Sequence, residues 1–367
     1  MTPRATALKI WQAGVDAVGG YAATQSAIQE LAPPDQILAV GKAAASMAQA
    51  ALDHFGQKPC LVVTKDGHGN ALSQDADLIE AAHPVPDERS LHAGAALRET
   101  VMSQPKSARL LLLVSGGASS LAEDLMPGVS LTDLTTLNAQ LLASGQDITE
   151  MNAQRRKLSR IKSGGLLGFF PGAHVDVLAI SDVPGDDLNV IGSGIGMVPE
   201  TATFSTHTQI IASNTHARDA AAQAAKTYGL SVVANLESLH ADLPTLAVHV
   251  GSQLRSMDKG VLILGGEPTV KLPPAPGRGG RNQALALALA EQIADHPDLV
   301  VVVGGTDGSD GPTQDAGGII DGSTWTENGA QFAISADSGT YLEAHDALLT
   351  TGPTGTNVMD LLVAIRT

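Results

Sequence analysis

Short polar turns that follow apolar segments carry most of the residues that could do chemistry in this sequence. Gly41-Lys42, Ser115-Gly116-Gly117 and Ser181-Asp182 each come directly after a run of Val, Leu, Ile or Ala. A lysine beside a helix N-terminus suits an anion, and paired glycines allow backbone N–H groups to converge on an oxyanion. The first two turns therefore predict phosphate binding, although a surface lysine and an ordinary glycine turn are the simpler interpretations of each one alone.

Carboxylates gather in two of the turns. Asp182-Val-Pro-Gly-Asp186 is suited to holding Mg²⁺ or to orienting a hydroxyl group. Asp307 and Asp310 repeat this arrangement later in the chain, without the remaining ligands of an EF-hand loop. Because Asp and Gly are also common turn residues, each group by itself is equally compatible with a structural role.

A polar stripe is expected on a helix from Thr149, which would cap it, to about Lys162. Asn152, Arg155, Ser159 and Lys162 follow one another at intervals of three or four residues, so they share one helix face. Such a face presents two cations and two hydrogen-bonding groups either to a ligand or to solvent. In a chain with a net charge of −16, the local concentration of Arg and Lys between Arg155 and Lys162 favours the interpretation that this face binds a ligand.

The last cluster surrounds a loop rich in Pro and Gly, from Lys271 to Arg281. Glu267 precedes the loop, Arg281 ends it where a helix is expected to begin, and Asn282 follows. The planar guanidinium of an arginine grips a carboxylate or phosphate through two parallel hydrogen bonds. The loop is a candidate lid, and a helix-capping or surface arginine is the structural alternative.

Composition and periodicity indicate the elements that must position these residues. Apolar runs alternate with Ala-rich helical stretches, and aromatic residues are only 3% of the 367 residues, which is typical of an α/β fold with parallel strands. Open α/β sheets bind ligands at the carboxyl ends of their strands, where the polar turns lie. A boundary near residues 236–243 divides the chain into expected domains 1–240 and 241–367. The expected strands are residues 36–40, 60–64, 109–114, 175–180, 209–212, 261–264 and 299–303.

Several classes of protein are disfavoured by the same sequence. The acidic net charge argues against nucleic acid and anionic membrane surfaces as partners. Cys60 is the only cysteine, so an internal disulfide is excluded. No stretch approaches the roughly 20 apolar residues of a membrane span, and no signal peptide is visible, so a cytoplasmic location is expected. The histidines lack metal-ligand spacing, and no Gly-x-Ser-x-Gly elbow supports a hydrolase.

Taken in order, the motifs resemble the glycerate 2-kinases that carry a C-terminal MOFRL domain, a family also labelled hydroxypyruvate reductase. The matching segments are VGKAAASMA, HPVPDERS, LVSGGASSL, NAQRRKLSRIKSGGL, AISDVPGDD, GGEPTV with GRGGRNQ, GGTDGSDGPT and TGPTGTNVMDL. The resemblance implies two α/β domains. One is an N-terminal Rossmann-like parallel sheet covered by helices, the other is a smaller MOFRL-type domain, and the active site lies in the cleft between them.

The activity implied by this resemblance is ATP-dependent phosphorylation of D-glycerate at its 2-hydroxyl, with Mg²⁺, giving 2-phosphoglycerate and ADP. Lys42, Arg281 and Asp182 would be catalytic, and Asp182 and Asp186 would hold the metal. The partners would be a small hydroxy acid and ATP, with no nucleic acid or membrane, and a homodimer is left open. The residues that bind substrate and nucleotide would be Ser115, Gly116, Gly117, Asn152, Arg155, Lys162, Glu267, Asn282, Asp307 and Asp310.

The chain departs from the family pattern in three places. Ser193-Gly-Ile-Gly-Met-Val stands where Ser-Gly-Pro-Thr is usual, Ala118 replaces a glycine, and Gln314 replaces an acidic residue. A kinase of a related hydroxy acid and a non-catalytic binding protein derived from the kinase are therefore alternatives. An NAD(P)-dependent hydroxypyruvate reductase is the third, but no strand is followed by the Gly-x-Gly-x-x-Gly fingerprint that such chemistry usually requires.

Overall fold

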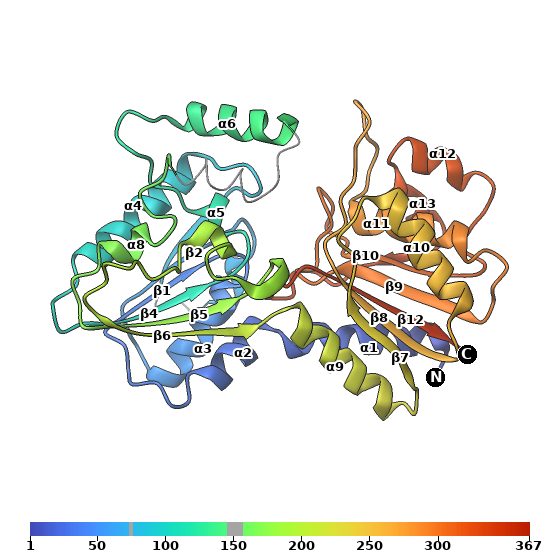
Figure 1. Ribbon diagram of the computed structural model, residues 1–367, viewed down its shortest axis with the longest axis horizontal. Helices are drawn as coiled ribbons and strands as arrows, with labels where there is room; N and C mark the ends of the chain where they lie inside the picture. Colours follow the sequence, from blue (N-terminus) through green and yellow to red (C-terminus); the bar gives the residue numbers. More distant parts are fainter. Residues whose placement is uncertain (73–75, 145–156) are drawn as a thin grey trace. The chain divides into compact units, whose positions relative to one another are not determined.

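The computed structural model describes residues 1–72, 76–144 and 157–367, and for residues 138–144 the description is limited to the backbone. The chain folds into two compact units (Figure 1). The parallel-sheet unit contains Gly19–Ser213 and Gly355–Asn357, and the mixed-sheet unit contains Met1–Val18, Asn214–Thr354 and Val358–Thr367.

The division differs from the expected boundary near residue 240 because both the N-terminal helix and residues 214–240 pack in the mixed-sheet unit. Helix α1 (Pro3–Ala17) buries Ile10 and Trp11 completely, and the indole Nε1 of Trp11 donates to the carbonyl of Leu361 at 2.9 Å. An N-terminal helix that covers a C-terminal strand cannot be placed from local sequence, because the contact spans 350 residues.

The parallel-sheet unit is built on six parallel strands in the order β3-β2-β1-β4-β5-β6. The expected strands of this region are confirmed, with β1 and β4 at the predicted bounds. Strand β3 was not expected, because it is an edge strand with only its last residue buried and so lacks a continuous apolar run. The strands are β1 (Gln36–Val40), β2 (Cys60–Lys65), β3 (Asp77–Ala81), β4 (Arg109–Val114), β5 (His174–Ile180) and β6 (Ser205–Ala212).

Helices cover both faces of this sheet, which explains why its central strands are buried on both sides. Leu38 and Leu112 face a core that also contains Leu97 and Val101 of α4, whereas α3 packs on β1 and β2. The helices are α2 (Gly20–Ala27), α3 (Ala44–Phe55), α4 (Glu88–Met102), α5 (Ala118–Leu121), α6 (Leu131–Ser144) and α8 (Gly165–Gly168).

The second sheet is mixed, with the order β11-β10-β9-β12-β8-β7, whereas the parallel sheet expected for the N-terminal part is confirmed. The C-terminal strand β12 lies between β8 and β9 and is antiparallel to both. Its side chains are buried on both faces, so this apolar strand fills the centre of the sheet. The strands are β7 (Val232–Glu237), β8 (Gly260–Gly266), β9 (Leu299–Gly305), β10 (Gly317–Asp321), β11 (Leu348–Leu349) and β12 (Asp360–Arg366).

Alternate residues of the mixed sheet enter two different cores, as the period of two in a β-strand requires. Val261 and Ile263 join the core beneath α1 and α9, whereas Leu262 and Leu264 join the core beneath α10 and α11 (Figure 1). The remaining helices are α9 (Asn214–Thr227), α10 (Leu243–Ser256), α11 (Arg281–Gln292), α12 (Gly329–Ile334) and α13 (Ser338–Ala344).

The helix expected up to Lys162 is wrong in its final part, and residues 149–156 lie outside the described residues. Residues 157–164 form turns and bends, and Ser159 makes an isolated antiparallel bridge with Leu125. The N–H of Arg160 donates to the carbonyl of Asp124 at 2.7 Å. These non-local backbone bonds replace the helical ones that the spacing of polar residues had indicated.

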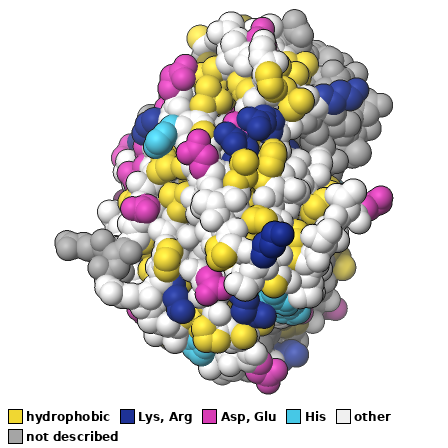
Figure 2. All heavy atoms as spheres, turned by 90° about the vertical axis from the view of Figure 1, so that its left-hand side faces the viewer, with side chains coloured by type: hydrophobic (Ala, Val, Ile, Leu, Met, Phe, Trp, Pro, Cys, Tyr) yellow, Lys and Arg dark blue, Asp and Glu magenta, His cyan; other side chains and the backbone are white. Residues whose placement is uncertain are grey.

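Charged side chains of both signs are mixed on the face drawn in Figure 2, where Lys and Arg lie among Asp, Glu and apolar side chains. Within the part of the chain that the structure describes, no helix combines the length and the apolar character needed to cross a membrane.

Candidate active site

Three predicted turns meet at one edge of the parallel sheet, because β1, β4 and β5 are neighbours and run in the same direction. The N–H of Lys42 donates to the carbonyl of Gly116 at 2.9 Å, and the N–H of Ala43 donates to Oγ of Ser115 at 3.1 Å. The backbone of Gly41 lies so close to Ser115 that a Cβ on Gly41 would be 2.2 Å from Oγ of Ser115. These contacts join the Gly41-Lys42 turn to the Ser115–Gly117 turn.

The side chain of Lys42 extends along the second glycine of this turn. A Cβ added to Gly117 would lie 3.2 Å from Cγ of Lys42 and 3.2 Å from Nε2 of His83. Gly117 also has a positive φ of 83°, a conformation that glycine adopts without strain. The structure therefore adds His83 to this cluster. The only sequence signal for His83 was its position in the HPVPDERS segment.

Asp182 is held by an asparagine from the other end of the chain. Nδ2 of Asn357 donates to Oδ2 of Asp182 at 3.1 Å. A Cβ on Gly116 would lie 2.1 Å from each of these two atoms, so only glycine leaves room for the pair. Asn357 was not singled out from the sequence, although it belongs to the TGTNVMD segment.

Asp186 lies in the turn after Asp182 and has a positive φ of 53°, next to Gly185 with φ 78°. Among the described residues, no three His, Cys, Asp or Glu side chains form a metal-binding group. Mg²⁺ at phosphate-transfer sites usually takes one or two protein carboxylates and completes its shell with phosphate and water. The carboxylates of Asp182 and Asp186 are the donor type that fits such an ion.

Lys162 is placed differently from the predicted ligand-binding face. Its ammonium pairs with Oε2 of Glu123, and the exposed fractions of the two side chains are 3% and 0%. The hydroxyl of Ser159 donates to the other oxygen of Glu123. Lys162 therefore neutralises a buried carboxylate that sequence reasoning missed, and Asn152 and Arg155 lie outside the described residues.

Arg281 is the centre of a second cluster, in the mixed-sheet unit, at the first residue of α11 as expected. Its Nε and Nη2 donate to Oδ2 and Oδ1 of Asp360 at 2.7 and 3.2 Å, and Nη1 pairs with Oε1 of Glu267 at 2.6 Å. Burial disfavours the charge of Arg281, but the two carboxylates outweigh burial and raise its pKa above the ordinary value. Asp360 was not expected from the sequence.

The position of Asp360 follows from the strand order. It is the first residue of β12 and lies opposite Gly266 of β8 and Gly305 of β9. Because β8 and β9 both run antiparallel to β12, their carboxyl ends share the sheet edge where β12 begins. The turns after β8 and β9 therefore flank Asp360, as the sequence predicted for strand ends.

Asp310 accepts backbone hydrogen bonds at the N-terminus of α11. Its Oδ1 receives the N–H of Asn282 at 3.1 Å, and its Oδ2 receives the N–H of Gln283 at 2.8 Å. Burial, together with the charge of Asp360, raises the pKa of Asp310 to about 7 despite these donors. The carboxylate of Asp307 instead accepts from the N–H and hydroxyl of Ser309, at 2.9 and 3.1 Å.

The loop expected as a lid is irregular, as predicted, and is anchored near its end by Arg278. The guanidinium of Arg278 pairs with Asp315 at 3.0 Å and with Glu343 at 2.5 Å. The backbone N–H of Arg278 also donates to Oδ1 of Asp337 at 2.9 Å. These bonds tie the loop to its own unit just before Arg281.

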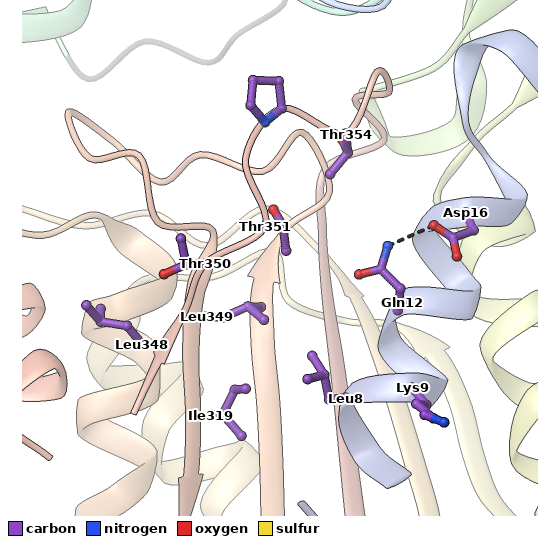
Figure 3. Close-up of a pocket in the computed structure, with 11 residues that line it drawn as sticks. Leu8, Lys9, Gln12, Asp16, Ile319, Leu348, Leu349, Thr350, Thr351 and Thr354 are labelled. Carbon is purple, nitrogen blue, oxygen red and sulfur yellow. Dashed lines mark hydrogen bonds between the residues drawn. The ribbon is translucent and has the colours of Figure 1, made fainter. Parts of the chain in front are cut away.

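A cavity of about 610 Å³ in the mixed-sheet unit involves none of the predicted site residues. Figure 3 shows α1 on one side, where Nε2 of Gln12 donates to Oδ1 of Asp16 at 2.8 Å, and the segment Leu348–Thr354 on the other. Most of its base is apolar, formed by Leu8, Ile319 and Leu349. The cavity and the Arg281 cluster are thus separate features of this unit.

Known proteins match this chain along nearly its whole length. Residues 6–228 match the family described as "Domain of unknown function (DUF4147)", and residues 260–360 match the MOFRL family. The D-glycerate 2-kinase of Thermotoga maritima is 35% identical, with 98% of this chain and 97% of that protein aligned. This chain belongs to the glycerate 2-kinase family.

The family also contains proteins with another name. A protein of Agrobacterium vitis that carries a hydroxypyruvate reductase name is 35% identical, over 89% of this chain and 97% of that protein. A crystal structure of glycerate kinase from Thermotoga maritima has a TM-score of 0.87 and 33% identity, and covers 99% of both chains. Membership in a family of kinases implies a phosphoryl donor and a small-molecule acceptor.

Two departures from the family pattern, Ala118 and Ser193, are buried, whereas Gln314 is exposed. Ser193 is buried, has a positive φ of 58°, and its hydroxyl lies 2.9 Å from that of Ser119. The carbonyl of Ser193 accepts the N–H of Ser163 at 3.1 Å. The methyl group of Ala118 lies 2.9 Å from the position of a Cβ on Gly192, the residue before Ser193, so Ala118 leaves no room for a side chain there.

Proposed function

We propose that this protein transfers the γ-phosphoryl group of ATP to the 2-hydroxyl of D-glycerate, giving 2-phosphoglycerate and ADP. The observation that carries the proposal is the meeting of Lys42, the Ser115–Gly117 turn and Asp182 at one sheet edge, in a chain that aligns with glycerate kinases almost end to end. Phosphoryl transfer depends mainly on positioning and charge neutralisation, which this set of groups supplies.

Lys42 and the two glycines are proposed to bind the transferred phosphoryl group. In phosphoryl transfer, negative charge spreads over the equatorial oxygens, where an ammonium group and backbone N–H groups stabilise it. The side chain of Lys42 runs along Gly117, so its charge and the backbone of the turn act on the same region. The new O–P bond forms at the acceptor oxygen as the bond to the β,γ-bridging oxygen breaks and ADP leaves.

Asp182 and Asp186 are proposed to serve the acceptor hydroxyl and a divalent cation. A bound Mg²⁺ supplies neutralisation of phosphate charge. Asp182, oriented by Asn357, is positioned to accept the hydrogen bond of the attacking hydroxyl, and its carboxylate takes the proton that the hydroxyl releases. Asp186, four residues further along the chain in the same turn, is then the second carboxylate for the cation.

Arg281 is proposed to bind the carboxylate of glycerate. Its pairing with Asp360 and Glu267 fixes the plane of the guanidinium, and a planar fork recognises a carboxylate through parallel hydrogen bonds. Glu267 is the more exposed of the two partners, at 45% against 1%. A substrate carboxylate therefore replaces Glu267 as the partner of Nη1, while Asp360 keeps its bonds.

The test is ADP formation by the purified protein with ATP, Mg²⁺ and D-glycerate, followed by ³¹P NMR to assign the phosphorylated carbon. We expect glycerate-dependent ADP and 2-phosphoglycerate. Lys42→Met should lower kcat by about 10²- to 10³-fold, the typical cost of removing one group that stabilises transition-state charge. Lys106→Met, at an exposed lysine of the same unit, is the matched control and should retain activity.

The hydroxypyruvate reductase name of one relative requires a parallel assay. NADH and NADPH oxidation with hydroxypyruvate should be absent, because the turn after β1 lacks the glycine fingerprint of dinucleotide binding. Phosphorylation of another hydroxy acid in place of glycerate would redirect the proposal to that substrate. Nicotinamide oxidation without ADP formation would overturn it.

A further inference from the structure

One short segment of the chain contacts both predicted clusters. Gly355–Asn357 belongs to the parallel-sheet unit and Val358–Thr367 to the mixed-sheet unit, so the chain passes from one unit to the other at the peptide bond after Asn357. Asn357 binds Asp182 in the first unit, and Asp360 binds Arg281 in the second. The two partner residues are three positions apart in the sequence.

Both contacts are built into buried surroundings. The exposed fractions of Asn357 and Asp360 are 8% and 0%, although both side chains are polar. Gly116 closes over the Asn357–Asp182 pair, as the 2.1 Å approach of a Cβ there indicates. A buried polar group without a partner is costly, so neither side chain can leave its partner unless another group replaces it.

The backbone between the two contacts is held as well. Met359 has a positive φ of 66°, a conformation that a non-glycine residue keeps only where its surroundings enforce it. The hydroxyl of Thr306 donates to the carbonyl of Met359 at 2.6 Å and accepts the N–H of Val358 at 2.8 Å. The N–H of Thr306 also donates to the carbonyl of Met359, at 3.0 Å.

We propose that Asn357–Asp360 is a coupling segment that sets the positions of Asp182 and Arg281 together. Asn357 and Asp360 are then positioning residues, which act on the reaction through Asp182 and Arg281. Three residues of extended chain span at most about 11 Å, so the covalent backbone limits the separation of the two positioning residues whatever the arrangement of the two units. A shift of either contact is transmitted along this short, fixed backbone to the other.

The roles of Asn357 and Asp360 in catalysis rest on the proposed function. They predict that one substitution changes mainly KM and the other mainly kcat. Asp360→Asn leaves Arg281 charged but frees its guanidinium, so KM for glycerate should rise about 10-fold with a smaller change in kcat. Asn357→Ala leaves the carboxylate of Asp182 but frees its orientation, so kcat should fall about 10-fold with little change in KM. Asp360→Glu and Asn357→Gln, which keep the charge and the amide, should restore part of each loss.

The coupling itself is tested without reference to the reaction. Hydrogen exchange followed by mass spectrometry is measured on peptides that contain residues 181–187 and 281–285, for the full-length wild type and each single variant. Coupling requires that Asp360→Asn raise exchange in residues 181–187, and that Asn357→Ala raise it in residues 281–285. Thr306→Val, which removes the two hydroxyl hydrogen bonds to this backbone and leaves Asn357 and Asp360 in place, should raise exchange in both peptides.

The two sets of measurements separate the possible failures. Exchange that changes only in the peptide beside each substitution would overturn the coupling segment, even if the protein phosphorylates glycerate. A wild type that forms no ADP with glycerate would remove the proposed function, while exchange would still decide the coupling. Wild-type kcat and KM in both Asp360→Asn and Asn357→Ala would overturn their role as positioning residues.

Discussion

The guanidinium of Arg281 and the carboxylate of Asp360 form a two-point pair, with Nε–Oδ2 at 2.7 Å and Nη2–Oδ1 at 3.2 Å. The carboxylate is almost fully buried, whereas a third of the arginine side chain is exposed. This geometry directs one edge of the guanidinium into the protein and leaves Nη1 to Glu267. Arg281 is thus a fixed cation that pairs with one buried and one exposed carboxylate.

Arg281→Lys should impair activity although it keeps the positive charge. An ammonium group cannot make the two parallel bonds to Asp360 and also bind a second carboxylate in a defined plane. The loss of one hydrogen bond to a charged group, about 1.5–3 kcal/mol, corresponds to a fall in kcat/KM of about 10- to 150-fold. Steady-state kinetics with Arg255→Lys, at an exposed arginine of the same unit, as control will show whether the effect is specific.

Gly116→Ala should reduce activity more than stability. The added methyl group would displace the ends of Asn357 and Asp182, both 2.1 Å from the Cβ position, and these are side-chain atoms that can move. We expect a free energy of unfolding lower by about 1–3 kcal/mol and a large fall in kcat. Gly168→Ala, where no atom lies within 4 Å, should leave both unchanged or slightly raise stability. Full activity of Gly116→Ala would exclude a need for the Asn357–Asp182 pair.

Glu123→Gln should destabilise the parallel-sheet unit, because it leaves the ammonium of Lys162 buried without a charged partner. Removing one member of a buried ion pair typically costs about 3–5 kcal/mol. Chemical denaturation of Glu123→Gln, Lys162→Met and the double variant will measure this cost. The double variant should be more stable than Glu123→Gln, since no unpaired charge remains. Equal stability of wild type and Glu123→Gln would show that the pair makes no net contribution.

Asp310 should make stability depend on pH. Its pKa is raised to about 7 in the folded protein, mainly by burial, against about 3.9 in an unfolded chain. The folded state therefore holds the proton more tightly than the unfolded chain does. The resulting contribution to the free energy of unfolding is fully present below about pH 4 and is lost as the pH rises through about 7. Relative to Asp310→Asn, the free energy of unfolding of the wild type should fall between about pH 5 and pH 8. Urea denaturation at stepped pH values tests this, and a constant difference would contradict it.

Local sequence was sufficient for the strand-to-turn units of the site. Strands β1 and β4 have the predicted bounds, and Lys42 and Ser115 stand in the turns that follow them. Arg281 begins α11, as the Pro- and Gly-rich loop before it indicated. These features depend on apolar runs and on turn residues that are close in the chain, so short-range propensities determine them.

Polar spacing misled where non-local contacts decided the structure. The intervals between Ser159 and Lys162 suit a helix face, but the bridge from Ser159 to Leu125 and the charge of Glu123 give a different conformation. Lys162, which the sequence proposed as a ligand contact, pairs with Glu123. A buried carboxylate attracts a cation more strongly than solvent does, and no pattern within residues 157–162 reveals that carboxylate.

The sequence by itself determined the fold class, the family and the turns that carry Lys42, Asp182 and Arg281, because these depend on neighbouring residues. Only the tertiary structure decided their partners. Asn357 and Asp360 come from near the end of the chain, and Asp360 reaches Arg281 because β12 inserts between β8 and β9. The position of β12 in the sheet depends on how much apolar surface the complete sheet buries. This depends on contacts between distant residues, which local spacing along the chain does not reveal.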